Sequence, residues 1–147
     1  MKAVQQQGRD NARTPIQWDN SPHAGFTTGT PWLKVNPNYT DINVQAALAD
    51  KQSIFFFYKQ LLAFRKAHKS LIYGDFELFL PDSEDIFAYR RWDEQGDFVV
   101  VLNFTSAPKT YELPVDLNNY QMMLSNYQTA NEFLLPWEAR VYSKVTH

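Results

Sequence analysis

The sequence predicts an α+β chain in which an irregular loop and one long helix precede an antiparallel all-β domain. Prolines and glycines interrupt the first forty residues, apolar residues recur at helical spacing from Ser53 to His68, and short apolar runs separated by turn residues follow Gly74. With 147 residues, 44% of them hydrophobic, the chain can form one domain with a core, or a small domain plus an appended segment.

Residues 8–41 are predicted to form a long ordered loop that lies on another surface. Prolines and glycines are spaced so that neither a helix nor a central strand can develop: Pro15, Pro22, Gly25, Gly29, Pro31 and Pro37. Large apolar side chains argue against disorder: Ile16, Trp18, Phe26, Trp32, Leu33 and Val35.

The strongest helix signal runs from Ser53, a candidate N-cap, to His68, after a short turn at residues 44–49. One stripe has helical spacing: Ile54, Phe57, Tyr58, Leu61 and Arg65. Three more apolar residues lie off that stripe: Phe55, Phe56 and Leu62. The first half of the helix is therefore apolar nearly all round, which is typical of a helix covered on more than one side.

After Gly74 the sequence predicts short strands joined by tight turns. The expected strands are residues 75–80, 86–92, 98–104, 109–113, 120–125 and 138–144. The connections are too short for crossover helices, so the sheet should be antiparallel. The run Phe98-Val99-Val100-Val101-Leu102 is expected to be the central strand.

Composition and charge exclude several classes of function. Charged residues make up 20% of the chain with a formal net charge of −2, so no basic surface for nucleic acid is expected. There is no cysteine, no signal-peptide pattern and no run long enough to span a membrane, and we expect a cytoplasmic protein. His23, His68 and His147 lack metal-ligand spacing, and neither a metal nor a cofactor is expected.

The most specific stretch is Gly8–Asp19, which holds two arginines, two carboxylates, two amides and a tryptophan. One interpretation is a loop held to a neighbour by ion pairs, with Trp18 as a packing anchor. The other is a sugar-recognition loop, because a guanidinium group aligned by an acidic neighbour can bond hydroxyls with fixed geometry. The residues alone leave both open.

This stretch and several later ones resemble the region that follows the last catalytic segment in one group of the α-amylase family, glycoside hydrolase family 13. That group contains the oligo-1,6-glucosidases, dextran glucosidases, sucrose isomerases and trehalose-6-phosphate hydrolases. The runs that carry the resemblance are residues 9–19, 23–29, 31–32, 35–39, 42–44 and 53–66, with Gly74, Tyr89, Asn103-Phe104, Asn126-Tyr127 and Pro136–Ala139.

The resemblance implies that residues 1–70 are the loop and last helix of a catalytic (β/α)8 barrel, and that residues 71–147 are the C-terminal antiparallel β-sheet domain. It implies a retaining α-glucosidase acting on α-linked gluco-oligosaccharides or disaccharides. Its nucleophilic Asp, acid/base Glu and stabilising Asp would precede Arg9, so this chain alone should not be an enzyme. Arg9 would contact the non-reducing-end glucose, and Asp10 and Arg13 would hold the loop.

Several alternatives remain. The parent could be a trehalose-6-phosphate hydrolase or a sucrose isomerase, since linkage preference would reside in other loops. A free-standing carbohydrate-binding β-domain is an alternative of another class, and it would need exposed stacking platforms among Trp18, Trp32, Trp92 and Trp137. We also expect the chain to self-associate through the apolar side of helix 53–68.

Overall fold

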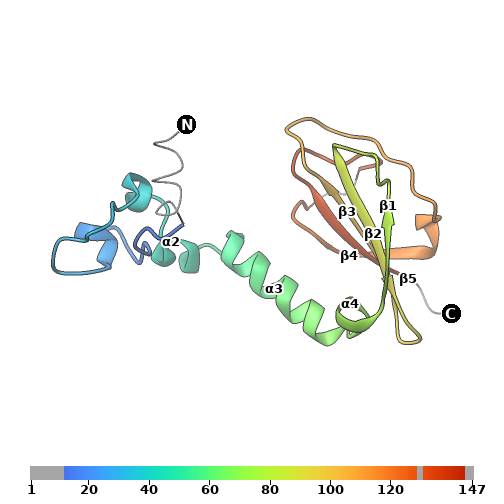
Figure 1. The fold of residues 1–147 in the computed structure, drawn as a ribbon, viewed down its shortest axis with the longest axis horizontal. Coiled ribbons are helices and arrows are strands. Elements are labelled where there is room, and N and C mark those ends of the chain that lie inside the picture. The colour runs from blue at the N-terminus through green and yellow to red at the C-terminus, as the bar shows by residue number, and fades with distance from the viewer. Residues whose placement is uncertain (1–11, 129–130, 145–147) are drawn as a thin grey trace. The chain divides into compact units, whose positions relative to one another are not determined.

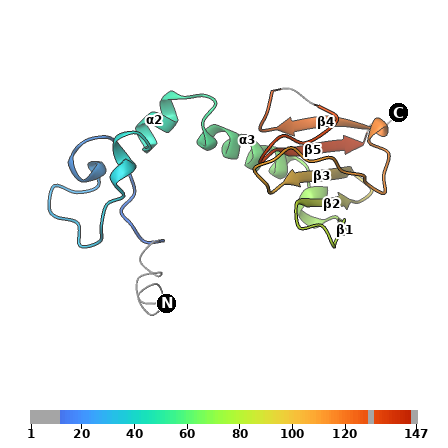
Figure 2. The same cartoon turned by 90° about the horizontal axis from the view of Figure 1, so that it is seen from above.

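A computed structural model describes residues 12–128 and 131–144 (Figures 1 and 2). The chain divides into two compact units, residues 1–59 and 60–147. The helices are the 3-10 turns η1 (Pro22–Gly25) and η2 (Pro37–Thr40), then α2 (Val44–Ala49), α3 (Ile54–Ala67) and α4 (Ser70–Tyr73), and a third 3-10 turn, η3 (Leu117–Asn119). No helix in the described part of the chain is both long and apolar enough to cross a membrane.

The short element at residues 44–49, expected as a turn, is the α-helix α2. Asn43 caps it, because its side-chain oxygen accepts a hydrogen bond from the Ala46 amide at 2.8 Å. The next segment leads into α3, where the Ser53 hydroxyl donates to the Ala47 carbonyl at 2.7 Å. The end of α2 is thus tied to the start of α3.

Helix α3 has the length that the apolar spacing predicts, but none of its residues is fully buried. In the second unit, Leu61 and Phe64 pack beside the sheet cluster of Val100, Leu124 and Val141. The Phe64 ring meets the Phe98 ring edge-on with 6.0 Å between centroids. This side of the helix therefore contributes to the core of the β-domain.

The strands are β1 (Asp75–Phe79), β2 (Ile86–Trp92), β3 (Asp97–Asn103), β4 (Tyr120–Ser125) and β5 (Ala139–Lys144). They form one antiparallel sheet in the order β1-β2-β3-β5-β4. The valine-rich run of residues 98–102 is therefore the central strand, as the sequence predicts. Its burial on both faces explains why it is apolar without alternation.

The predicted strand at residues 109–113 is wrong. Only Lys109 pairs, in an isolated bridge with Leu134. The flanking Pro108 and Pro114 lack the amide hydrogens that a longer ladder needs. The apolar alternation of this region has another cause, because every second side chain packs on the sheet core: Tyr111, Leu113, Val115 and Leu117.

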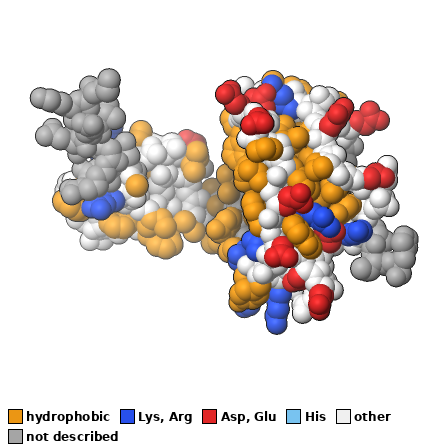
Figure 3. Space-filling view, turned by 45° about the vertical axis from the view of Figure 1, so that its right-hand side comes forward, with side chains coloured by type: hydrophobic (Ala, Val, Ile, Leu, Met, Phe, Trp, Pro, Cys, Tyr) orange, Lys and Arg blue, Asp and Glu red, His pale blue; other side chains and the backbone are white. Residues whose placement is uncertain are grey.

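The two faces of the sheet are covered differently. One face carries the larger core, in which Ala88, Val99, Val101 and Leu134 are completely buried. The other face carries the smaller cluster around Val100, to which α3 contributes. Figure 3 shows that hydrophobic side chains also reach the surface of this strand-bearing unit, with charged side chains around them.

The β-domain contains a buried ion pair between Arg140 and Glu138. Arg140 Nε lies 2.6 Å from Glu138 Oε1, and both side chains are almost fully buried. The guanidinium also donates to the carbonyls of Asn131 and Phe133. Burial lowers the pKa of Arg140, but the bonds to Glu138 and Tyr142 outweigh burial and raise it. The pair organises the loop before β5.

Candidate functional site

Of the three residues predicted to serve the substrate site, Arg9 and Asp10 lie outside the described residues. Arg13 is exposed, in a turn with Ala12. The structure therefore describes the candidate loop from Ala12 onward, and it shows what holds that loop. The roles of Arg9, Asp10 and Arg13 stay predictions.

The loop is closed by a short backbone clasp. The amides of Trp18 and Asp19 both donate to the Ala24 carbonyl, at 2.9 and 3.3 Å. Asp19 Oδ1 then accepts from the Ser21 amide at 2.8 Å and from the Ser21 hydroxyl at 2.5 Å. Both bonds lower the pKa of Asp19, and the bond from the Ser21 hydroxyl has the larger effect. Asp19 is thus an ionised anchor of the turn.

Left-handed backbone makes this clasp possible. His23, Ala24 and Gly25 all have positive φ, at 59°, 60° and 65°. A Cβ at Gly25 would lie 2.6 Å from Asp19 Oδ1, which is closer than a real Cβ contact allows. Glycine is therefore needed at position 25 both for its backbone angle and for the approach of the Asp19 carboxylate.

A second set of bonds joins the start of the loop to the segment before α2. The Gln17 side chain donates to Asn38 Oδ1 at 3.1 Å and also to the Ile42 carbonyl. The Gln17 carbonyl accepts from the Val44 amide at 2.8 Å, and the Trp18 carbonyl from the Gln45 amide at 2.9 Å. Residues 17–18 thus lie beside residues 38–45.

Polar bonds hold the described part of the loop. Its aromatic side chains, which we expect to pack on another surface, are open to solvent in this chain: Trp18 is 47% exposed and Trp32 93% exposed. These bonds run through polar side chains such as Ser21, Asn38 and Asn43, whose part in the loop the sequence analysis did not predict. For Ser21 and Asn38 a signal was present, because each stands beside a proline and both are typical turn and cap residues.

Several acidic side chains can be placed individually in the structure. Asp75 and Glu77 are exposed on β1. Among the buried or half-buried acids, Glu138 is bonded to Arg140, and Asp97 is bonded to Arg90 at 2.8 Å and to Tyr120 at 3.0 Å. Within residues 12–128 and 131–144, no group of three potential ligands could hold a metal ion.

Comparison with known proteins assigns the chain to a family. Residues 1–74 match the alpha amylase catalytic domain, and residues 79–135 match the alpha amylase C-terminal all-beta domain. The chain belongs to the α-amylase family. Its fold is a segment of the catalytic domain followed by the all-β domain with a five-stranded antiparallel sheet, so the predicted fold class is confirmed.

Several relatives in the α-amylase family share most of this chain. An oligo-1,6-glucosidase of Parageobacillus thermoglucosidasius is 45% identical over 97% of the chain and 27% of its own length. A glucan 1,6-alpha-glucosidase of Streptococcus pneumoniae is 43% identical over 95% and 26%. The chain therefore spans about a quarter of the length of the curated relatives it matches.

Solved structures give the same family. The trehalose-6-phosphate hydrolase of Bacillus licheniformis superposes with a TM-score of 0.87 and 36% identity, covering 94% of this chain and 26% of that one. The isomaltulose synthase of Klebsiella sp. LX3 superposes with a TM-score of 0.84 and 34% identity, covering 92% and 25%.

Proposed function

We propose that this chain is the C-terminal part of a retaining α-glucosidase of the oligo-1,6-glucosidase type, which hydrolyses α-glucosidic bonds in short oligosaccharides. One observation carries the proposal: oligo-1,6-glucosidases match 97% of the chain at up to 45% identity. The chain corresponds to only about a quarter of them, so the activity is proposed for the larger protein and not for these residues alone.

In this proposal the chain supports catalysis without performing it. Residues 1–70 belong to the catalytic barrel, with loop 8–41 on its substrate side, and residues 71–147 form the C-terminal domain. A retaining mechanism needs two carboxyl groups about 5–5.5 Å apart, and other parts of the protein supply them. Arg9 binds the substrate, while Asp10 and Arg13 hold the loop. The absence of cysteine suits a cytoplasmic location.

A second candidate within the family is a trehalose-6-phosphate hydrolase or a sucrose isomerase. Structural similarity favours it, because the solved neighbours include a trehalose-6-phosphate hydrolase and an isomaltulose synthase. A candidate of another class is a carbohydrate-binding β-domain, which the exposure of Trp32 (93%) and Trp137 (59%) favours.

The test is a chimera in which this chain replaces the 150 aligned residues of the Parageobacillus thermoglucosidasius enzyme. We expect it to hydrolyse isomaltose. Arg9→Ala in the chimera should lower kcat/KM by about 2–4 kcal/mol, the scale of a charged hydrogen bond lost from a desolvated site. Arg9→Lys should recover little, because a point charge does not replace the planar fork.

Lys34→Ala is the matched control, since Lys34 is an exposed cation of the same loop. It should leave kcat/KM unchanged. A folded chimera without activity on isomaltose, but with activity on trehalose-6-phosphate or sucrose, favours the second candidate. If Arg9→Ala behaves like Lys34→Ala, the substrate role of Arg9 is wrong.

A further inference from the structure

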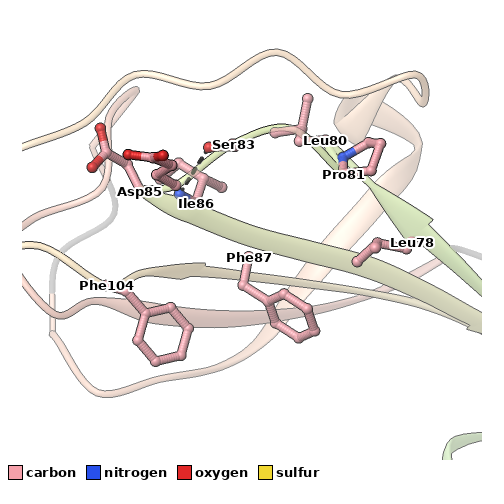
Figure 4. Close-up of a pocket in the computed structure, with 9 residues that line it drawn as sticks. Leu78, Leu80, Pro81, Ser83, Asp85, Ile86, Phe87 and Phe104 are labelled. Carbon is pink, nitrogen blue, oxygen red and sulfur yellow. Dashed lines mark hydrogen bonds between the residues drawn. The ribbon is translucent and has the colours of Figure 1, made fainter.

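A hollow of about 470 Å³ lies beside the β1–β2 turn, and apolar side chains such as Phe87 line most of it (Figure 4). Two of its polar groups are bonded within the chain. The Ser83 hydroxyl accepts from the Ile86 amide at 3.0 Å, and Asp85 lies 2.6 Å from Lys109. A small-molecule site needs polar groups that converge on the ligand, and these two are turned to other partners. The polar bonds that bear on the proposed activity lie instead in the loop before α2.

The first turn of α2 is capped by a segment far upstream in the sequence. A helix leaves its first amide groups without partners of its own. In α2 the Val44 and Gln45 amides donate to the carbonyls of Gln17 and Trp18, at 2.8 and 2.9 Å. The third amide donates to the Asn43 side chain at 2.8 Å. The first three amides of α2 therefore all have partners, and two of these partners belong to residues 17–18.

The Gln17 side chain strengthens this junction. Its amide group donates to Asn38 Oδ1 at 3.1 Å and to the Ile42 carbonyl. A glutamine amide has two N–H donors, so both are used on the segment that leads into α2. Within that segment the buried Asn43 donates to the Tyr39 carbonyl at 2.9 Å. Gln17 therefore joins the loop to an ordered segment through its side chain as well as its backbone.

A short, stiff stretch connects Gln17 to the residues predicted to serve the substrate. Residues 14–16 separate it from Arg13, and Arg9 lies further upstream in the same loop. Pro15 is buried, and a proline fixes its own φ and restricts the residue before it. Fixing Gln17 on α2 therefore limits where the preceding residues can lie.

Placement of a substrate-binding group matters steeply for an enzyme. A displacement of about 1 Å, even one caused far from the reacting atoms, can cost about a hundredfold in rate. The two bonds of the Gln17 side chain are thus of a kind that can affect substrate binding without contact to the substrate.

We propose that Gln17 is a positioning residue for substrate binding in the parent protein. Its side-chain bonds to Asn38 and Ile42 hold the loop on the start of α2, so that Arg9 is placed to contact the sugar. This inference rests on the proposed function, in which Arg9 binds the substrate. It adds the side chain that holds the loop in place for Arg9.

Gln17→Glu in the chimera tests this role, because it removes both N–H donors and keeps the shape of the side chain. The carboxylate would face two acceptors, Asn38 Oδ1 and the Ile42 carbonyl, so both bonds are lost. The KM for isomaltose should rise by about tenfold, because the loop no longer places the substrate-binding group. Loss of folded protein alone would lower kcat and leave KM unchanged.

Gln52→Glu is the matched control. It makes the same chemical change at an exposed side chain in the turn between α2 and α3. Surface substitutions of this kind usually change free energies by less than about 0.5 kcal/mol. The KM of this variant should therefore stay within about twofold of that of the unsubstituted chimera.

Arg9→Ala distinguishes positioning from a separate effect. If Gln17 acts through Arg9, Gln17→Glu should change kcat/KM by less than about twofold once Arg9 is replaced by alanine, since the group to be placed is gone. Equal factors in the two backgrounds would mean that the residues act independently, which overturns the proposal.

Amide exchange in the isolated chain tests the junction without the chimera. Gln17→Glu should accelerate exchange of the Val44 amide by about tenfold, which corresponds to about 1.4 kcal/mol, because that amide is held by the Gln17 carbonyl. Gln52→Glu should leave it unchanged.

The outcomes separate this proposal from the proposed function. A folded chimera that hydrolyses none of the α-glucosides overturns the proposed function, and with it the role of Gln17 in substrate binding. An active chimera in which Gln17→Glu and Gln52→Glu have the same KM overturns the positioning role alone. Should the chimera not fold, exchange at Val44 decides: faster exchange in Gln17→Glu alone supports the proposal, and equal rates in the two variants overturn it.

Discussion

Gly25 shows how one residue fixes the geometry of the candidate loop. The clasp at Trp18 and Asp19 depends on an Ala24 carbonyl that is turned by three successive left-handed residues. Ala24 is not of a residue type that adopts this region readily, whereas histidine is found there more often than most non-glycine residues. The hydrogen bonds of the clasp must therefore stabilise an otherwise unfavourable backbone, and local strain of this kind concentrates at functional sites.

Gly25→Ala should open this clasp. The new Cβ would meet the Asp19 carboxylate at 2.6 Å, and the positive φ adds a backbone cost, together about 1–3 kcal/mol. Amide exchange at Trp18 and Asp19 should accelerate by about tenfold or more, since 1.4 kcal/mol corresponds to a factor of ten.

Gly29→Ala is the matched control, because a Cβ there would meet only the Thr27 hydroxyl, at 3.8 Å. It should leave exchange at Trp18 and Asp19 unchanged. Equal exchange in the two variants would show that the left-handed turn does not hold the clasp.

At the residue scale the sequence predicted where the loop lies but not what holds it. Proline and glycine spacing marks residues 8–41 as irregular, since those residues restrict the backbone locally. The bond from Gln17 to Asn38 joins positions 21 residues apart, and no local pattern indicates such a contact. The predicted role of Arg9 in substrate binding rests on the resemblance to a family, because a guanidinium group alone does not show which ligand it binds.

At the scale of elements, periodicity predicted most of the sheet because burial on a pleated surface imposes alternation. It failed at residues 109–113, where an extended segment covers the core and alternates without forming a ladder. Helix α3 shows the converse. Several of its apolar side chains are exposed in the described structure, namely Ile54, Phe55, Tyr58 and Leu62. A spacing pattern does not show which partner covers each side of a helix.

Helix α3 should mediate self-association of the isolated chain. Phe55, Tyr58 and Leu62 follow helical spacing and are 45%, 58% and 49% exposed, on a side different from that of Leu61 and Phe64. Covering this side would remove apolar surface worth about 25 cal/mol per Å². Sedimentation equilibrium at micromolar to millimolar concentration should show a dimer.

Phe55→Ser combined with Leu62→Ser should return the chain to a monomer. Gln60→Ser, at an exposed polar position of the same helix, should leave the dimer intact. A strict monomer at millimolar concentration would mean that the exposed side of α3 does not drive pairing.

At the scale of the whole molecule, the chain joins a segment of the catalytic domain to an all-β domain, and the two proposals assign it different partners. As part of an α-glucosidase, its exposed apolar side chains on α3 and on strands β1 and β2 would be covered by the rest of a larger protein. As a carbohydrate-binding domain, its exposed tryptophans would be platforms for sugar rings. The first explanation accounts for apolar exposure on helix and sheet together, whereas the second accounts only for Trp32 and Trp137.

The isolated chain should therefore neither hydrolyse nor bind short α-glucosides. General acid catalysis and nucleophilic attack both need carboxyl groups placed across the glycosidic bond, and the buried Glu138 is committed to Arg140. We expect no glucose release from isomaltose, sucrose, trehalose-6-phosphate or p-nitrophenyl α-glucoside. Isothermal titration with isomaltose or maltose should show no binding at millimolar concentration.

Glucose release that survives repurification of the chain would contradict the proposal that other parts of the protein supply the catalytic carboxyl groups. Millimolar binding that Trp32→Ala or Trp137→Ala abolishes would favour the carbohydrate-binding domain, because a stacking platform loses its contact when the ring is removed.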